Sequence, residues 1–256
     1  MKVSKDLFFS GAMSLGDAIV CSPIVNRFAQ NTNLLILPSQ RKFYDTLKCL
    51  YQDTPNIVVK EFDGPGFEQA YIDQNNLTRI ESPDIQATQV FIPNLNRYVP
   101  AMVNWDRQIY EFYDIPYSVR YREFKFPKQV LGSGALYDKL VGGKEDYVLF
   151  HQQTGAHPNG MGINLAGFRE ANGMPPYKIV EIDDSITSNM CQYIELIENA
   201  KEIHTVNTSF FWLVDSLFNR TNAQLFYHDC RADSVAQINS RWNNNRWIRV
   251  HHLEKV

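Results

Sequence analysis

Short apolar runs alternate along the chain with segments in which apolar residues recur at helical spacing. In the first half, this pattern predicts strands at 7–10, 34–38, 57–62 and 89–93, and helices at 17–30, 40–51 and 101–113. The stretch 63–84 contains Gly64-Pro65-Gly66 and Ser82-Pro83 and is predicted to be irregular. Strands that alternate with helices indicate an α/β fold with a parallel sheet.

The same alternation returns in the second half. It predicts strands at 146–151, 177–183, 202–207 and 223–228, and helices at 129–141, 185–200 and 209–218. The segment after the first of these strands, QQTGAHPNGMGINLAGFREANGMPP, is predicted to be a loop, and so long a loop is more often functional than idle. A chain of 256 residues has room for two cores of roughly 100 to 150 residues each. We therefore expect two domains, 1–127 and 145–256.

Composition and charge exclude several classes of protein. Hydrophobic residues make up 44% of the chain and charged residues 21%, as in folded globular proteins. The net charge of −3 creates no overall field that would attract nucleic acid. The four cysteines form no CxxC pair and are expected to be free thiols in a reducing compartment. No apolar run reaches the roughly 18 residues that cross a bilayer, so a cytoplasmic protein is expected, with peripheral membrane contact left open.

The segment FFSGAMSLGDAIVCSPIV, residues 8–25, joins the first predicted strand to the first predicted helix. Gly11 and Gly16 have the spacing of a phosphate-binding GxxxxGK[ST] loop, but Asp17 and Ala18 replace its Lys and hydroxyl residue. A carboxylate would repel phosphates, and Met13 breaks the dinucleotide-binding GxGxxG pattern. What remains is Gly16 as a tight turn and Asp17 in the first helical turn, where the helix dipole favours negative charge. Asp17 is either presented to a ligand cleft or acts as a helix cap.

Other motifs for catalysis or metal binding are weak. Asp183 and Asp184 are adjacent, so their side chains diverge, and they are expected to cap the following helix rather than hold a metal. No HExxH or GxSxG motif occurs. The terminal stretch 240–256 interleaves arginines with Trp242 and Trp247. Such a stretch either contacts bases or lipid headgroups, or packs its tryptophans on the domain while the arginines stay solvated.

Segments in both halves resemble one enzyme family. Ser14-Leu15-Gly16-Asp17-Ala18-Ile19-Val20, followed by Ser22-Pro23-Ile24, is similar to the opening of the lipopolysaccharide heptosyltransferases and related GT-B glycosyltransferases. Tyr147 to His151 resembles the first strand of their donor domain, and the segment from Glu195 to Ser209 resembles their helix and A-x-x-x-I-x-x-D-[ST]-G motif. The resemblance implies two Rossmann-like domains that face each other across a cleft.

The resemblance also implies an activity. The chain would be an inverting, metal-independent glycosyltransferase that moves a sugar from a nucleotide-sugar donor to a hydroxyl of a glycan, a lipid-linked or another acceptor. The nucleotide-sugar is then a co-substrate, and no cofactor is expected. Asp17 would be the catalytic base that takes the acceptor proton. The implied donor-binding residues are Gly16, His151, Thr154, Thr208 and Ser209. His157 is a further candidate contact, and the alternative for His151 is a hydrogen-bonded residue at a strand end.

The sequence departs from the family pattern at several positions. Asn207 replaces an aspartate, Ser209 a glycine, and Trp212 a frequent histidine. A basic residue expected soon after the donor-domain strand is missing, and Arg169 and Lys178 are the nearest substitutes. These departures keep two alternatives open: a protein that binds nucleotide-sugars or glycans without turnover, and a nucleotide-sugar epimerase.

Overall fold

The computed structural model describes residues 7–9, 14–36, 38, 40–61, 67–75, 77–80, 88–92, 97–101, 105–143, 145–154, 159–230 and 246–252. The chain divides into two compact units that interleave along the sequence. The first unit comprises 1–84, 106–130 and 188–191, and the second comprises 85–105, 131–187 and 192–256. The predicted domain bounds, 1–127 and 145–256, stay a prediction.

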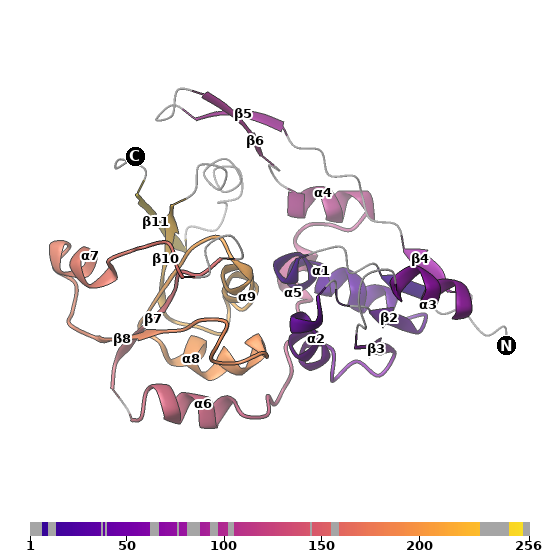
Figure 1. Cartoon of the computed structure of the whole chain (residues 1–256), viewed down its shortest axis with the longest axis horizontal. Helices are drawn as coiled ribbons and strands as arrows, with labels where there is room; N and C mark the ends of the chain where they lie inside the picture. Colours follow the sequence, from indigo (N-terminus) through magenta and orange to yellow (C-terminus); the bar gives the residue numbers. More distant parts are fainter. Residues whose placement is uncertain are drawn as a thin grey trace. The chain divides into compact units, whose positions relative to one another are not determined.

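A parallel sheet organises the first unit (Figure 1). Its strands are β1 (Leu7–Phe9), β2 (Leu34–Ile36), β3 (Ile57–Val59) and β4 (Thr78–Ile80), in the order β3-β2-β1-β4. Each neighbouring pair is parallel, and β1 lies between β2 and β4 with Leu7 opposite both Leu34 and Thr78. The connecting helices are α1 (Leu15–Phe28), α2 (Tyr44–Leu50) and α3 (Phe67–Asn75). The short 3-10 helix η1 (Arg41–Phe43) precedes α2. This is the order of the first four strands in the 3-2-1-4-5-6 sheet of a Rossmann fold.

Helix α1 begins earlier than its apolar pattern predicts. Ser14 is the N-cap, its hydroxyl accepts the Asp17 N–H at 3.4 Å, and the Asp17 carboxylate accepts the Ser14 N–H at 2.8 Å. These two bonds form a capping box and satisfy backbone donors that have no partner inside the helix. Gly16 is therefore a buried residue of the first helical turn, and the predicted tight turn at this position is wrong.

The prediction that 63–84 is irregular is also wrong. Helix α3 and strand β4 lie in this stretch, and α3 packs Ile72 against Leu35 of β2. A nine-residue helix and a three-residue strand carry too few apolar positions to show a clear period. The predicted strand at 89–93 is present as β5 (Thr88–Ile92), but it pairs in an antiparallel hairpin with β6 (Arg97–Ala101) rather than in a parallel sheet.

The first unit contains a buried ion pair. Helix α4 (Trp105–Phe112) contributes Asp106, and α5 (Val119–Arg122) contributes Arg120, whose Nη1 lies 2.9 Å from Asp106 Oδ2. Both side chains are only 1% exposed. The hydroxyl of Tyr117 donates to Asp106 and accepts from Arg120 at 2.7 Å, so the two charges share a third partner. Buried charges persist in a core only when they are paired in this way.

The second unit contains a five-stranded parallel sheet. Its strands are β7 (Tyr147–His151), β8 (Lys178–Glu181), β9 (Glu202–Thr205), β10 (Gln224–Asp229) and β11 (Trp247–His251), in the order β11-β10-β9-β7-β8. All neighbouring strands are parallel. Strand β11 was not predicted from the terminal stretch. Its Trp247 is buried and packs on Phe211, while Arg249 pairs with Asp229.

Helices cover both faces of this sheet. Helix α7 (Leu165–Ala171) packs on Val148 and Phe150 of one face, although its sequence was predicted to be loop. The opposite face is covered by α6 (Ser133–Leu140), α8 (Ile194–Asn199) and α9 (Ser209–Ser216), which contact Tyr147 and Tyr227. Helix α8, with the 3-10 helix η3 (Met190–Tyr193) before it, is much shorter than the predicted helix 185–200.

The predicted α/β class with parallel sheets is thus confirmed. The arrangement of two domains across a cleft stays a prediction. Among the described residues, no helix is both long enough and apolar enough to span a bilayer.

Candidate functional site

The order of strands in the second unit reverses between β7 and β9. From β7 the chain adds β8 on one side, then returns to place β9 on the other side. In open α/β sheets, ligands bind beside the carboxyl ends of the two strands that flank such a reversal. His151 ends β7 and lies opposite Thr205, which ends β9. Two residues implied as donor ligands, His151 and Thr208, therefore flank this position.

Thr208 and His151 are in contact there. Thr208 is the N-cap of α9, and its hydroxyl accepts the Phe211 N–H at 3.4 Å. The same hydroxyl lies 3.4 Å from Nδ1 of His151, within hydrogen-bond distance of the imidazole. Burial lowers the pKa of His151 to about 4, although Asp184 and Asp183 act in the opposite direction. The imidazole is consequently neutral at pH 7.

The amino end of α9 offers backbone donors to an anion. Ser209 and Phe210 are its first two residues, and their N–H groups have no acceptor within the helix. The helix dipole adds partial positive charge at the same place. The Phe210 ring stacks on His151 with centroids 5.2 Å apart, and Tyr193 meets Phe210 edge-on. A neutral imidazole, two half-buried hydroxyl groups and these N–H groups form a place suited to a phosphate or diphosphate.

The loop that follows β7 and the loop that follows β8 are hydrogen-bonded to each other beside this site. Asp183 accepts hydrogen bonds from the Ser185 N–H at 2.7 Å and from the Ser185 hydroxyl, which lower the pKa of its carboxyl group. Asp183 thus caps a turn, and the expectation that it caps the predicted helix 185–200 is wrong, because no helix begins there. Gln153 accepts the Asp184 N–H at 3.2 Å, and so connects the two loops. Thr154 lies one residue further on and is half-buried.

Asp17 and Gly16 lie in the first unit, at the start of the helix that follows β1. Strand β1 is also the position at which that unit's strand order reverses. The Asp17 carboxylate is half-exposed and takes part in the capping box with Ser14. The capping interpretation is therefore confirmed in its geometry, and the role of Asp17 as a base stays a prediction. Residues 10–13, which include Gly11, and His157 lie outside the described residues.

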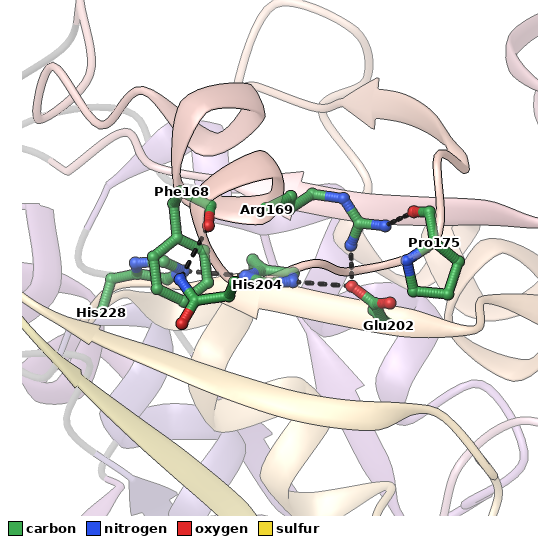
Figure 2. Close-up of polar contacts among 7 residues, drawn as sticks. Phe168, Arg169, Pro175, Glu202, His204 and His228 are labelled. Carbon is green, nitrogen blue, oxygen red and sulfur yellow. Dashed lines mark hydrogen bonds and ion pairs between the residues drawn. The ribbon is translucent and has the colours of Figure 1, made fainter.

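A buried polar chain, which no sequence motif signalled, crosses the face of the second sheet that α7 covers (Figure 2). Arg169 of α7 donates to the carboxylate of Glu202 and to the carbonyl of Pro175. His204 Nε2 lies 3.2 Å from the same carboxylate, His204 Nδ1 lies 2.8 Å from His228 Nε2, and His228 Nδ1 lies 2.7 Å from His252 Nε2. Because Glu202 can only accept, every imidazole of this chain donates through Nε2 toward Glu202.

Burial keeps the inner histidines of this chain neutral. It lowers the pKa of His204 to about 2, with further lowering by His228 and Arg169, and the pKa of His228 to about 3. The rings of His204 and Phe226 stack with centroids 4.2 Å apart, and Phe168 of α7 meets both histidines edge-on. The period-two pattern of a strand could have placed Glu202 and His204 on one face of the sheet. It could not have shown that His204 lies beside His228 of the neighbouring strand.

These contacts correct two of the sequence expectations. Arg169 cannot replace the missing basic residue of the donor side, because it is buried against Glu202. Lys178 begins β8, at the amino end of the sheet, and its Nζ donates to the Val141 carbonyl at 2.9 Å. Trp212, at the position of a frequent family histidine, is buried against Trp105 with ring centroids 5.4 Å apart.

Comparison with known proteins identifies the fold. No family model matches the chain, and no curated protein matches it. Among solved structures, a glycosyltransferase family 9 protein from Veillonella parvula is similar, with a TM-score of 0.52 and 8% identity over 98% of this chain and 87% of the other. A dodecameric, iron-containing heptosyltransferase, TibC, solved with ADP-D-β-D-heptose, has a TM-score of 0.53 and 13% identity, covering 98% of this chain and 65% of the other. The E. coli heptosyltransferase WaaC has a TM-score of 0.44 and 11% identity over 96% of this chain and 92% of its own. The chain thus shares its α/β fold with glycosyltransferases of the heptosyltransferase type.

The iron of TibC raises the question of a metal site in this chain. Within the ranges that the structure describes, no group of three or more His, Cys, Asp or Glu side chains is placed to hold a metal ion. The imidazoles of His204, His228 and His252 bind one another in a line instead of converging on one point. The described residues therefore do not fit an iron site.

Proposed function

We propose that the protein is a glycosyltransferase that takes a sugar from a nucleotide-sugar and transfers it to an acceptor hydroxyl. The observation that carries the proposal is the cluster of His151, Thr208 and Ser209 at the strand-order reversal of the second sheet. The fold shared with sugar transferases, one of them solved with ADP-D-β-D-heptose, supports it. The acceptor in this proposal is a glycan, a lipid-linked compound or another hydroxyl compound.

The donor diphosphate is proposed to bind at the amino end of α9. The N–H groups of Ser209 and Phe210 would donate to its oxygens, and Thr208 and neutral His151 would orient it. As the bond between the anomeric carbon and the diphosphate breaks, these groups stabilise the negative charge on the leaving oxygen. We propose that they do so in place of a divalent cation, so that EDTA should leave the rate of transfer unchanged.

Asp17 is the proposed general base. Its carboxylate would accept the proton of the acceptor hydroxyl as that oxygen attacks the anomeric carbon from the side opposite the leaving diphosphate, so that the configuration inverts. The substitution Asp17→Asn separates this role from capping. The amide oxygen of asparagine can still accept the Ser14 N–H, but it cannot take a proton. We expect transfer to fall by about 100-fold or more with little change in Tm; unchanged transfer would leave Asp17 as a cap alone.

Nucleotide binding tests the donor site. Thr208→Val removes a hydroxyl that caps a helix, and Thr221→Val is a matched control in the same unit. The hydroxyl of Thr221 donates to the Ile197 carbonyl at 2.8 Å and accepts the Ala223 N–H at 3.1 Å, just before the amino end of β10. We expect only Thr208→Val to weaken the binding of nucleoside diphosphates and nucleotide-sugars in calorimetric titrations. Equal affinities in the two variants would refute the proposed site.

One observation favours a second candidate function, which is binding of a nucleotide-sugar without transfer. Trp212 is a core residue at a position where the similar enzymes often carry a histidine, so it supplies no titratable group. A binding protein would bind the donor tightly, release no free sugar from it during long incubation and show no change on Asp17→Asn. A measurable rate of donor hydrolysis that depends on Asp17 would favour the transferase.

A further inference from the structure

The second unit contains the tripeptide Asn-Gly-Met twice, at residues 159–161 and 172–174. In both copies the asparagine is exposed and the glycine has a positive φ, 87° at Gly160 and 61° at Gly173. Glycine has no Cβ to shield its backbone nitrogen, which can therefore approach the side-chain amide carbon of the preceding asparagine. Attack on that carbon also needs a glycine N–H that can lose its proton and an asparagine side chain that can turn toward it. The two copies differ in both respects.

Both reacting groups of the second copy are held by hydrogen bonds. A Schellman motif ends α7: the Gly173 N–H donates to the Glu170 carbonyl at 3.1 Å, and the N–H of the next residue donates to the Arg169 carbonyl at 3.0 Å. The Asn172 side-chain amide donates to the Phe168 carbonyl at 2.7 Å, which directs it back along the helix and away from the Gly173 nitrogen. Attack at Asn172 therefore requires that the end of α7 opens first.

The first copy lies in the loop after β7, where the surroundings of the glycine are fixed but the reacting groups are not. Gln152 donates through Nε2 to Glu181 at 2.8 Å and accepts the Ile163 N–H at 3.0 Å, so its side chain has a defined position. Gly160 packs against this side chain so closely that a Cβ there would lie 2.9 Å from Cδ of Gln152. Within the ranges that the structure describes, no hydrogen bond holds the Asn159 side chain or the Gly160 N–H. In that part of the chain, attack at Asn159 therefore breaks no hydrogen bond.

We propose that Asn159 is a site of spontaneous deamidation and that Asn172 is protected from the same reaction. Hydroxide removes the proton of the Gly160 N–H, and the nitrogen attacks Cγ of Asn159. A C–N bond forms, the bond from Cγ to Nδ2 breaks, and Nδ2 takes up a proton from water and leaves as ammonia. Water then opens the cyclic imide at one of its two carbonyl groups, which leaves aspartate or isoaspartate at position 159. One water is consumed, one ammonia is released, and nothing is oxidised or reduced.

The product changes the loop that begins directly after His151. Either form adds a negative charge to this loop, and isoaspartate also adds a carbon atom to its backbone. The extra carbon lies directly before Gly160, so the contact of Gly160 with Gln152 has to rearrange. The reaction needs only water, so it occurs whether or not the protein transfers sugars.

Peptide mapping of aged native protein tests the proposal. Wild-type protein is incubated in mildly alkaline buffer, digested under acidic conditions that suppress further reaction, and analysed for peptides in which an amide NH₂ has been replaced by OH. We expect Asn159 to be converted at least about tenfold faster than Asn172, because only Asn172 requires the opening of a helix end. Equal rates at the two asparagines, faster conversion of Asn172, or no conversion of Asn159 would overturn the proposal.

Two controls separate the effect of the structure from that of the sequence. In urea both copies are unfolded, so the difference in rate should disappear; a difference that persists would refute the protection by α7. Asn159→Gln lengthens the side chain and makes cyclisation far slower, so the folded variant should form almost no isoaspartate, measured with an S-adenosylmethionine-dependent isoaspartate methyltransferase. Undiminished methylation of this variant would also overturn the proposal, because the reaction would then occur at another residue. The mapping of wild-type protein decides the matter even if the variant does not fold.

Discussion

The histidine chain of the second unit makes the stability of the protein depend on pH. The pKa values of His204 and His228 are about 2 and about 3 in the folded protein, against an ordinary value of 6.5. Because the folded values are lowered, the unfolded chain binds protons below about pH 6.5 that the native chain does not bind. The stability is therefore fully present above that pH, and is lost as the pH falls from about 6.5 toward 3.

The size of this loss follows from the unfolded state. At about pH 5 the protonated form of an unfolded imidazole exceeds the neutral form by a factor of about 30. Each such histidine therefore favours unfolding by about 2 kcal/mol. The two histidines together predict a loss of about 4 kcal/mol between about pH 7.5 and 5. The measurement is urea unfolding of the second unit at a series of pH values, followed by the fluorescence of buried Trp247.

The substitution His228→Gln isolates one of these protons. A glutamine amide can donate to His204 Nδ1 and accept from His252 Nε2, so the line of hydrogen bonds can continue without a titrating group. We expect the variant to lose about 2 kcal/mol less than wild type between the two pH values. Phe226→Leu is the control: it alters packing on His204 without removing a titrating group, and should lower stability equally at both. If His228→Gln has the pH dependence of wild type, the reasoning is refuted.

Three further substitutions test local interactions of the fold. Asp106→Asn leaves the buried Arg120 charge without its counter-ion and should destabilise the first unit by about 3 to 5 kcal/mol in urea unfolding; a cost below that of a surface ion pair would contradict the burial of this pair. Ser14→Ala removes one bond of the capping box and should cost about 1 kcal/mol, seen as a lower Tm. Gly160 has φ of 87°, and a Cβ there would lie 2.9 Å from Cδ of Gln152. Gly160→Ala should therefore lower Tm and speed proteolysis of the loop after β7, and an unchanged Tm would show that Gln152 moves aside.

The sequence alone predicted most of the elements because their signals are local. Compact apolar runs gave the strands β1, β2, β3, β7, β9 and β10, and helical spacing gave α1 and α9 close to their observed bounds. Short or polar elements such as α3, β4, α7 and β11 were missed, because three to nine residues carry little periodicity and their position depends on neighbours. The start of α1 was misplaced for a similar reason: Gly16 reads as a turn unless the bonds between Ser14 and Asp17 are known.

The candidate site, too, could be predicted from the sequence only in part. The residue types at positions 151, 208 and 209 are visible in the sequence alone. The sequence also predicted the start of the helix at which Thr208 and Ser209 lie. The burial that lowers the pKa of His151, its contact with Thr208, the ion pair of Arg169 with Glu202 and the histidine chain could not be predicted from the sequence. All of these depend on which strands and helices become neighbours. Hydrophobic periods and capping motifs extend over only a few residues, so the sequence by itself determined the helices and strands. Strand order and helix packing bring together residues that are tens of positions apart, so only the tertiary structure decided the chemistry of the side chains on those elements.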